Sequence, residues 1–256
     1  MLWLLENLET VTFEALEPLL PRISESRRAR VLSMKQEQAR VQSVLAELLL
    51  RHALREEYGL AELPKIETGK KGKPFFPDHP DVHFNLSHCK TAVACALDSA
   101  PVGVDVQELR PLHRAARPLA AASPSLPLEG KLSPVRTLVT DEVVPQERKT
   151  PPVYRILSEP ERAWVEAGET SAEQDRRFTA VWTCKEAYGK AVGEGFLYDL
   201  RSTEFLPRKK PWRQSGYLFR YCDLGDTALT LCAEHPLRLR RVELRRLISK
   251  LLEEQP

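Results

Sequence analysis

Long apolar runs are absent from this chain. Its 256 residues are 42% hydrophobic and 29% charged, the composition of an ordinary soluble globular protein, and they contain no run of about 18 apolar residues that would span a membrane. Four glutamates among residues 1–20 argue against a secretion signal. We therefore expect a cytoplasmic protein with no membrane partner.

Cysteine is scarce, and neither sign of charge is in large excess. The five cysteines are an odd number and form no CxxC pair, which excludes a disulfide framework or a zinc knuckle. The 38 basic and 36 acidic side chains leave a net charge of +2, too little to indicate nucleic-acid binding. Basic runs at 208–210 and 238–246 suggest that alternative, but such runs more often form solvated faces. We expect no nucleic-acid partner.

Aromatic residues are missing from Asn85 to Val153, and 8 of the 20 prolines lie between Pro111 and Pro152. Because such a segment buries little apolar area, it predicts a flexible linker or insertion, with an ordered proline-rich loop as the alternative. The chain then divides into an N-terminal lobe, 1–110, a linker, 111–152, and a C-terminal lobe, 153–256.

Helices and short strands follow one another in a similar order in both lobes. Apolar residues at helical spacing predict a helix over Gln36–Tyr58 that ends at Gly59, and another over Arg177–Val192 that ends at Gly193. A long helix with short, antiparallel strands in each lobe indicates an α+β fold of two similar halves. The other predicted elements are strands at 82–86, 92–97, 102–106, 216–222 and 227–233, a helix at 158–165, and a strand or helix at 238–251.

Two polar side chains share one face of the predicted strand at 102–106. Alternation places its three valines on one face and directs Asp105 and Gln107 together to the other. Two side-chain oxygens at a strand end supply part of a Mg²⁺ site, with water and a substrate phosphate completing the octahedral shell. The alternative is that Asp105 is a turn former or a solvated charge.

Glu186 and Lys190 lie four residues apart on a predicted helix and therefore share a face. A surface ion pair is the simplest interpretation. Phe178, Trp182 and Tyr188 nearby indicate a helix covered on most sides, where charged residues need a metal, a partner or a ligand.

Two further segments are suited to phosphate. The loop Lys70–Pro74 places three lysines, among them Lys71 and Lys73, around a glycine without forming a Walker loop, although exposed basic loops without a ligand are common. The next strand ends in Ser87 and His88, both of which donate hydrogen bonds.

Hydrolase and zinc chemistry fit the sequence poorly. Adjacent Ser87 and His88 do not readily form a nucleophile and base pair, and a GxSxG motif is absent. His79 and His83 have a spacing that binds zinc on a helix, but neighbouring prolines disfavour a helix there.

Together these segments form an ordered series: GKP at 72–74, FNLSH at 84–88, GVDVQ at 103–107 and WTCKEAYGKAVGEG at 182–195. The series resembles the Sfp-type 4'-phosphopantetheinyl transferases, whose pattern is a GKP loop, an N-x-SH motif, a G-[IV]-D-x-E strand and a W-[ST]-x-KE-[SA]-x-x-K helix. The resemblance covers about residues 36–107 and 154–195. It implies two lobes related by a pseudo-twofold axis, with the active site in the cleft between them, in a monomer.

The resemblance also implies an activity. Members of this family transfer the phosphopantetheine arm of coenzyme A to a serine of an acyl or peptidyl carrier protein, use Mg²⁺, and release 3',5'-adenosine bisphosphate. It implies that Asp105 and Glu186 bind the metal and that Lys190 contacts the pyrophosphate, which makes these three the catalytic residues. The residues expected to contact coenzyme A are Arg40, Lys71, Lys73, Ser87, His88 and Lys190.

The sequence departs from the family pattern at two places. Gln107 stands where many members have a second acidic ligand, and a neutral amide binds Mg²⁺ less strongly. The segment from Arg110 to Pro152 is longer than the usual connection between the halves. The first departure favours an alternative, a coenzyme A-binding regulatory protein with weak catalytic activity.

Overall fold

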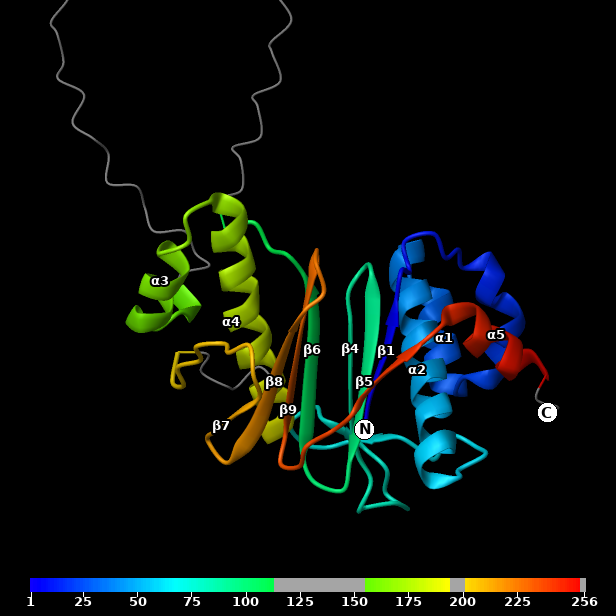
Figure 1. Ribbon diagram of the computed structural model, residues 1–256. Helices are drawn as coiled ribbons and strands as arrows, with labels where there is room; N and C mark the ends of the chain where they lie inside the picture. Colours follow the sequence, from blue (N-terminus) through cyan, green and yellow to red (C-terminus); the bar gives the residue numbers. More distant parts are fainter. Residues whose placement is uncertain (113–154, 194–200, 254–256) are drawn as a thin grey trace, which may run out of the picture.

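The computed structural model contains two four-stranded sheets that pack against each other, and helices cover the outer face of each (Figure 1). The structure describes residues 1–112, 155–193 and 201–253. The predicted linker, apart from its first two residues, lies outside this part of the chain. The mixture of helices and strands confirms the α+β class.

The first sheet has the strand order β10-β1-β5-β4, with β1 antiparallel to β5 and parallel to β10. The 22-residue helix α2 packs against it, and three shorter helices lie on the same side (Figure 1). The strands are β1 (Leu2–Glu6), β4 (His83–His88), β5 (Ala92–Asp98) and β10 (Leu239–Val242), and the helices are η1 (Glu14–Arg22), α1 (Glu25–Ser33), α2 (Glu37–Tyr58) and α5 (Leu244–Glu253).

The second sheet has the order β6-β9-β8-β7, and all its neighbours are antiparallel. Helix α4 crosses its outer face, and α3 packs against α4. The elements are β6 (Val102–Glu108), β7 (Trp212–Gln214), β8 (Tyr217–Asp223), β9 (Thr227–Ala233), α3 (Glu159–Glu166) and α4 (Ser171–Val192).

The inner faces of the two sheets share one apolar core. In β1 the alternation of side chains sends Leu2 and Leu4 toward the second sheet, while Trp3 and Leu5 face α2. The valines of β6 meet Leu2 and Leu4 there, as their alternation predicts. The layers therefore run helix, sheet, sheet, helix.

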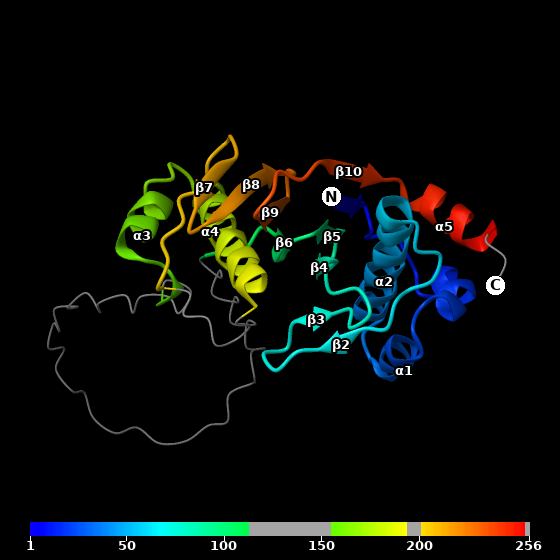
Figure 2. The same ribbon diagram turned by 90° about the horizontal axis from the view of Figure 1, so that it is seen from below.

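A short hairpin carries the predicted phosphate loop. Strands β2 (Glu67–Thr68) and β3 (Pro74–Phe75) pair antiparallel, and Gly72 between them has a φ of 86°, which glycine tolerates best. Figure 2 shows this hairpin between α4 and α2. No helix among the described residues is long and apolar enough to cross a membrane.

Strand pairing crosses the expected lobe boundaries in both directions. β6, which carries Asp105 and was placed with residues 1–110, pairs with β9 in the second sheet. β10, placed with residues 153–256, pairs with β1 in the first sheet, and α5 lies on the same side. Hydrogen bonding between distant strands decides these positions, and local sequence patterns do not encode it.

The two long helices end at Gly59 and Gly193, as predicted, each with a left-handed backbone. Helix α4 begins six residues earlier than predicted, because Thr170 caps a polar first turn that has no apolar stripe. The segment predicted as a strand or a helix at 238–251 contains both. Strands β1 and β7 and helices η1 and α1 were not predicted.

Candidate active site

The two sheets meet at their edge strands, β4 and β6. Hydrogen bonds to side chains join these two strands, in place of a ladder of backbone hydrogen bonds. The Asn85 Oδ1 accepts a hydrogen bond from the Val104 N–H at 2.9 Å, and the Ser87 Oγ accepts one from the Val106 N–H at 3.1 Å. Both β4 side chains are buried. The junction thereby holds Asp105, which lies between the two bridged residues, beside Ser87.

Gly103 allows α4 to lie very close to β6. A Cβ atom at Gly103 would come 2.0 Å from the Ala187 carbonyl oxygen and 2.5 Å from the Ala191 nitrogen. Such distances are far inside van der Waals contact, so only glycine fits here. The close approach brings the C-terminal half of α4 against the face of β6 that carries Asp105.

Asp105 is 6% exposed, and its two carboxylate oxygens have different surroundings. Oδ1 accepts hydrogen bonds from the Lys190 Nζ at 2.6 Å and the Ser87 Oγ at 2.9 Å. Oδ2 is buried and has no hydrogen-bond partner among the described residues. A buried carboxylate oxygen without a partner is costly, and it indicates a missing ligand such as a cation or water.

Lys190 pairs with Asp105, and the simple surface ion pair with Glu186 does not form. Its ammonium group donates to the Asp105 carboxylate, to the Ser87 Oγ at 3.2 Å and to the Val104 carbonyl at 3.1 Å. An ammonium group has three protons, so all are used. For Lys190 to contact a pyrophosphate, as predicted, one of these three hydrogen bonds would have to break.

Glu186 lies one helical turn before Lys190 and is half-buried. Desolvation, followed by the negative charge of Asp105, raises the pKa of Glu186, while Lys190 and Arg110 oppose the rise. Within the described part of the chain, the Glu186 carboxylate makes no hydrogen bond or ion pair. Two neighbouring carboxylates repel each other unless enough positive charge lies beside them. Such a pair is a typical site for a divalent cation.

Asp105 and Glu186 form a small donor set that fits a magnesium ion. Three or more His, Cys, Asp or Glu residues grouped for a metal do not occur among the described residues. Asp105 and Glu186 are hard oxygen donors, and the Asp105 Oδ2 lacks a partner. Mg²⁺ usually binds to one or two carboxylates and keeps several water or phosphate oxygens, so two protein ligands are sufficient.

Comparisons with known proteins show what this chain is similar to. The family model for the 4'-phosphopantetheinyl transferase superfamily matches residues 142–236, which include Glu186 and Lys190. The 4'-phosphopantetheinyl transferase psf-1 of Bacillus pumilus is 32% identical over 161 residues, 62% of this chain and 53% of that protein. Over these residues the chain is similar to the 4'-phosphopantetheinyl transferases.

Two other relatives carry the same description. The transferase Sfp of Bacillus subtilis (strain 168) is 38% identical over 71 residues, 27% of this chain and 32% of that protein. The transferase pptA of the fungus Paxillus involutus is 26% identical over 196 residues, 73% of this chain and 65% of that protein. The matches thus span from a third to two thirds of these relatives. They confirm the resemblance to the Sfp type, while the roles of single residues stay predictions.

Gln107 differs from the usual superfamily pattern and has a protein partner in this chain. Its Oε1 accepts a hydrogen bond from the Arg110 guanidinium at 3.1 Å, and that guanidinium also lies over the Trp182 ring, 4.1 Å from the centroid. One lone pair of the amide oxygen is therefore engaged. That Gln107 binds the metal stays a prediction.

The lysines of the GKP loop have different surroundings. Lys73 donates to the Ala191 carbonyl at 2.8 Å and to the Val102 carbonyl at 3.3 Å, so it ties the loop to the end of α4. Burial lowers the pKa of Lys73 to about 8. Its side chain lines a hollow of about 430 Å³. Lys71 is exposed.

His88 lies at the end of β4 near Lys190 and near two arginines that the sequence motifs do not predict as site residues. Desolvation by neighbouring protein atoms lowers the pKa of this exposed histidine, and the positive charges of Lys190, Arg27 and Arg30 lower it further. Arg27 and Arg30 come from α1, one turn apart. Their spacing on one helix face was a signal in the sequence, but only the fold shows that this face lies near His88.

Arg40, at the start of α2, stacks on an aromatic ring. Its guanidinium carbon lies 3.4 Å from the centroid of Phe13, and its Nε is buried without a partner among the described residues. This cation–π contact holds the side chain in one place. Its expected contact to coenzyme A stays a prediction.

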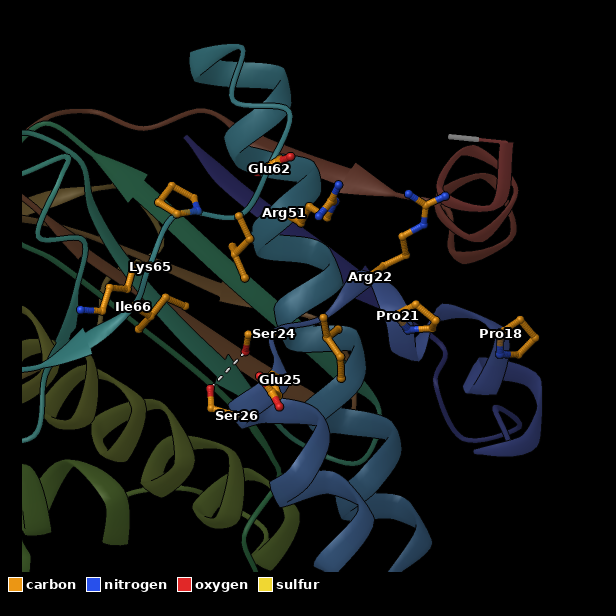
Figure 3. Close-up of a pocket in the computed structure, with 13 residues that line it drawn as sticks. Pro18, Pro21, Arg22, Ser24, Glu25, Ser26, Arg51, Glu62, Lys65 and Ile66 are labelled. Atoms are coloured by element: carbon orange, nitrogen blue, oxygen red, sulfur yellow. Dashed lines mark hydrogen bonds between the residues drawn. The ribbon is translucent and has the colours of Figure 1, made fainter. Parts of the chain in front are cut away.

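A separate hollow of about 820 Å³ lies where η1, α1 and the segment after α2 meet (Figure 3). Arg22, Arg51 and Lys65 line it, but the Lys65 amine points away from the two arginines (Figure 3) and pairs with Glu67 at 2.6 Å. None of the predicted site residues lines this hollow. We assign no ligand to it.

Proposed function

We propose that this chain transfers the 4'-phosphopantetheine arm of coenzyme A to a serine of an apo acyl or peptidyl carrier protein. The reaction depends on Mg²⁺ and releases 3',5'-adenosine bisphosphate. The observation that supports it most is the pair of carboxylates on β6 and α4: the Asp105 Oδ2 is buried without a partner, and Glu186 lies close by.

The chemical step exchanges one oxygen for another on phosphorus. The hydroxyl oxygen of the carrier serine attacks the phosphorus that bears the pantetheine arm and forms a new P–O bond. The bond from this phosphorus to the oxygen of adenosine bisphosphate breaks, and the serine proton passes to a base. Glu186 is our choice for that base, directly or through a water, because its raised pKa favours proton uptake.

Asp105 and Glu186 would hold the magnesium ion, with Gln107 as a third, weaker candidate. When bound, the ion supplies positive charge that offsets the charge developing on the pyrophosphate. Lys190 and Lys73 add fixed positive charge on the same side of β6, which is worth most in a site with few waters. His88, Ser87, Arg40 and Lys71 complete the proposed coenzyme A contacts.

The proposal includes an architecture. Residues 1–110 and 153–256 form two lobes with pseudo-twofold symmetry, apart from the exchange of β6 and β10, with the catalytic cleft between them and the segment 111–152 as the connection. The protein acts as a cytoplasmic monomer, without nucleic-acid or membrane partners.

A transfer assay tests this function. Incubation with coenzyme A, Mg²⁺ and a panel of apo carrier proteins should add one phosphopantetheine to a carrier, detected by intact mass. Glu186→Ala should abolish the addition, and Glu186→Gln should lower it strongly if Glu186 is the base. Full activity of Glu186→Gln would remove Glu186 from that role.

A second candidate is a coenzyme A-binding regulatory protein with weak turnover. It is favoured by Gln107, which replaces an acidic ligand and already bonds to Arg110. Calorimetric binding of coenzyme A together with no transfer to any carrier would support this alternative. Metal-dependent transfer would exclude it.

A further inference from the structure

Ser87 is buried at the junction of the two sheets, and its hydrogen bonds have only one possible direction. The hydroxyl lies 3.1 Å from the Val106 N–H, 3.2 Å from the Lys190 Nζ and 2.9 Å from the Asp105 Oδ1. The first two partners carry only protons to donate, so Ser87 accepts from both. Its single proton must then go to the Asp105 carboxylate.

This arrangement orients the Asp105 carboxylate. Lys190 and Ser87 both bind Oδ1, and the Lys190 ammonium is held in turn by the Val104 carbonyl. Rotation of the carboxylate would break two charge-assisted hydrogen bonds. Oδ2 is consequently held in a position where it is buried and has no partner among the described residues.

The free oxygen lies on the side of β6 that faces α4, where Glu186 and Lys190 share a helical face. We propose that Ser87 is a positioning residue, which holds the Asp105 carboxylate so that Oδ2 is presented to the metal. This inference rests on the proposed function, because it assumes the metal site of Asp105 and Glu186. It gives Ser87 a role different from the expected contact to coenzyme A.

The two roles predict different consequences of removing the hydroxyl. A residue that positions a metal ligand affects metal affinity whether or not coenzyme A is bound, and loss of such a partner typically costs 10-fold to 100-fold in affinity. A residue that contacts coenzyme A affects metal binding only when coenzyme A is present. Direct binding of Mn²⁺, followed by the electron paramagnetic resonance signal of the free ion, separates the two.

The experiment compares Ser87→Ala and Ser87→Thr with the unchanged protein, with and without coenzyme A. We expect Ser87→Ala to weaken Mn²⁺ binding by about 10-fold in both conditions. Ser87→Thr keeps a hydroxyl and should restore most of the affinity. Thermal unfolding of each variant checks that the fold is intact.

Asn85→Ala is the matched control, because it removes the neighbouring bridge to Val104 and leaves Asp105 untouched. Equal losses of Mn²⁺ affinity in Asn85→Ala and Ser87→Ala would overturn the proposal, since the junction as a whole would then be responsible. A loss confined to the condition with coenzyme A would overturn it in favour of a substrate contact.

Failure of the proposed function gives a different result. If the unchanged protein binds no Mn²⁺ in either condition and modifies no carrier, the metal site itself is wrong. If it binds Mn²⁺ and modifies a carrier, but Ser87→Ala binds the ion equally well, only the positioning role is wrong.

Discussion

Helices α2 and α4 have the same length, and each lies on the outer face of its sheet, but they pack by different means. Each has 22 residues and ends at a left-handed glycine. The buried face of α2 is rich in leucine and valine, and that of α4 consists mostly of alanine, threonine, cysteine and glycine. Small side chains and Gly103 bring α4 into backbone contact with β6, whereas large side chains of α2 fill the space between that helix and its sheet.

Each helix also buries one charge that a neighbouring helix neutralises. In α2, Glu47 binds Arg27 of α1 at 2.9 Å. In α4, Lys185 binds Glu161 of α3 at 2.8 Å, and both side chains are fully buried. Helix α4 also places Glu186 and Lys190 against its sheet, and Lys190 binds Asp105 of β6. The comparison shows that close approach, more than apolar area, builds the candidate active site.

The most damaging change to the α4 half should be Gly103→Ala. The new methyl group would collide with the Ala187 carbonyl, so α4 must move away from β6. We expect a loss of about 3 kcal/mol in the free energy of unfolding, measured by urea denaturation, together with loss of transfer activity. Gly69→Ala is the control, since its Cβ would meet only the Lys73 carbonyl at 3.4 Å. Equal stability of the two variants would show that α4 is not so close.

Lys190→Met tests whether the charges of α4 serve catalysis. It removes both the cation bound to Asp105 and the proposed pyrophosphate contact, so transfer should fall by about 100-fold. The free energy of unfolding of the metal-free protein should fall by about 1–3 kcal/mol, because a buried carboxylate loses its partner. Lys250→Met removes a partly exposed ion pair between Lys250 of α5 and Glu56 of α2. This change should lower the free energy of unfolding by at most about 1 kcal/mol. A similar loss of unfolding free energy in both variants would contradict the difference between α4 and α2.

The pH dependence of stability should have opposite signs in the two helices. Burial and the charge of Asp105 raise the pKa of Glu186 in α4, whereas the hydrogen bond from Lys250 lowers the pKa of Glu56 in α2. The Glu186 contribution is present below the ordinary glutamate pKa and is lost as pH rises through the raised value. The Glu56 contribution is present above the ordinary pKa and is lost as pH falls through the lowered value.

Urea denaturation of metal-free protein from about pH 2 to pH 7 measures both contributions. Glu186→Gln should remove a decrease in stability with rising pH, and Glu56→Gln should remove a decrease with falling pH. If Glu186→Gln leaves the pH profile unchanged, folding does not raise the pKa of Glu186.

Gln107→Glu should have the smallest effect and would sharpen the account of the metal site. A carboxylate at this position would pair with Arg110, which now bonds to the amide oxygen. We expect metal affinity to change by less than about threefold, measured as the Mg²⁺ concentration for half-maximal transfer. In an Arg110→Ala background the same substitution should tighten binding, because the carboxylate is then unpaired. A large gain with Arg110 present would indicate that Gln107 already faces the metal.

Much of the fold and the candidate site follows from local patterns. Apolar spacing predicts both long helices and their glycine ends, and alternation along β6 correctly separates its valines from Asp105. Motif order predicts the resemblance to the 4'-phosphopantetheinyl transferases, which the comparisons confirm. What the sequence leaves open are contacts between distant segments: the exchange of β6 and β10, the Lys190 bond to Asp105, the Ser87 bridge and the approach of Arg27 to His88. Each depends on tertiary packing, which periodicity does not encode.

The exchange of strands governs the order in which the chain acquires its structure. The first sheet needs residues 239–242, and the second needs residues 102–108, so neither half completes its pairing from a contiguous stretch of chain. During synthesis, strand β10, which pairs with β1, emerges more than 200 residues after β1. Such long-range pairings slow folding. The two halves therefore fold and unfold as one cooperative unit, and neither half cut from the other would retain a whole sheet.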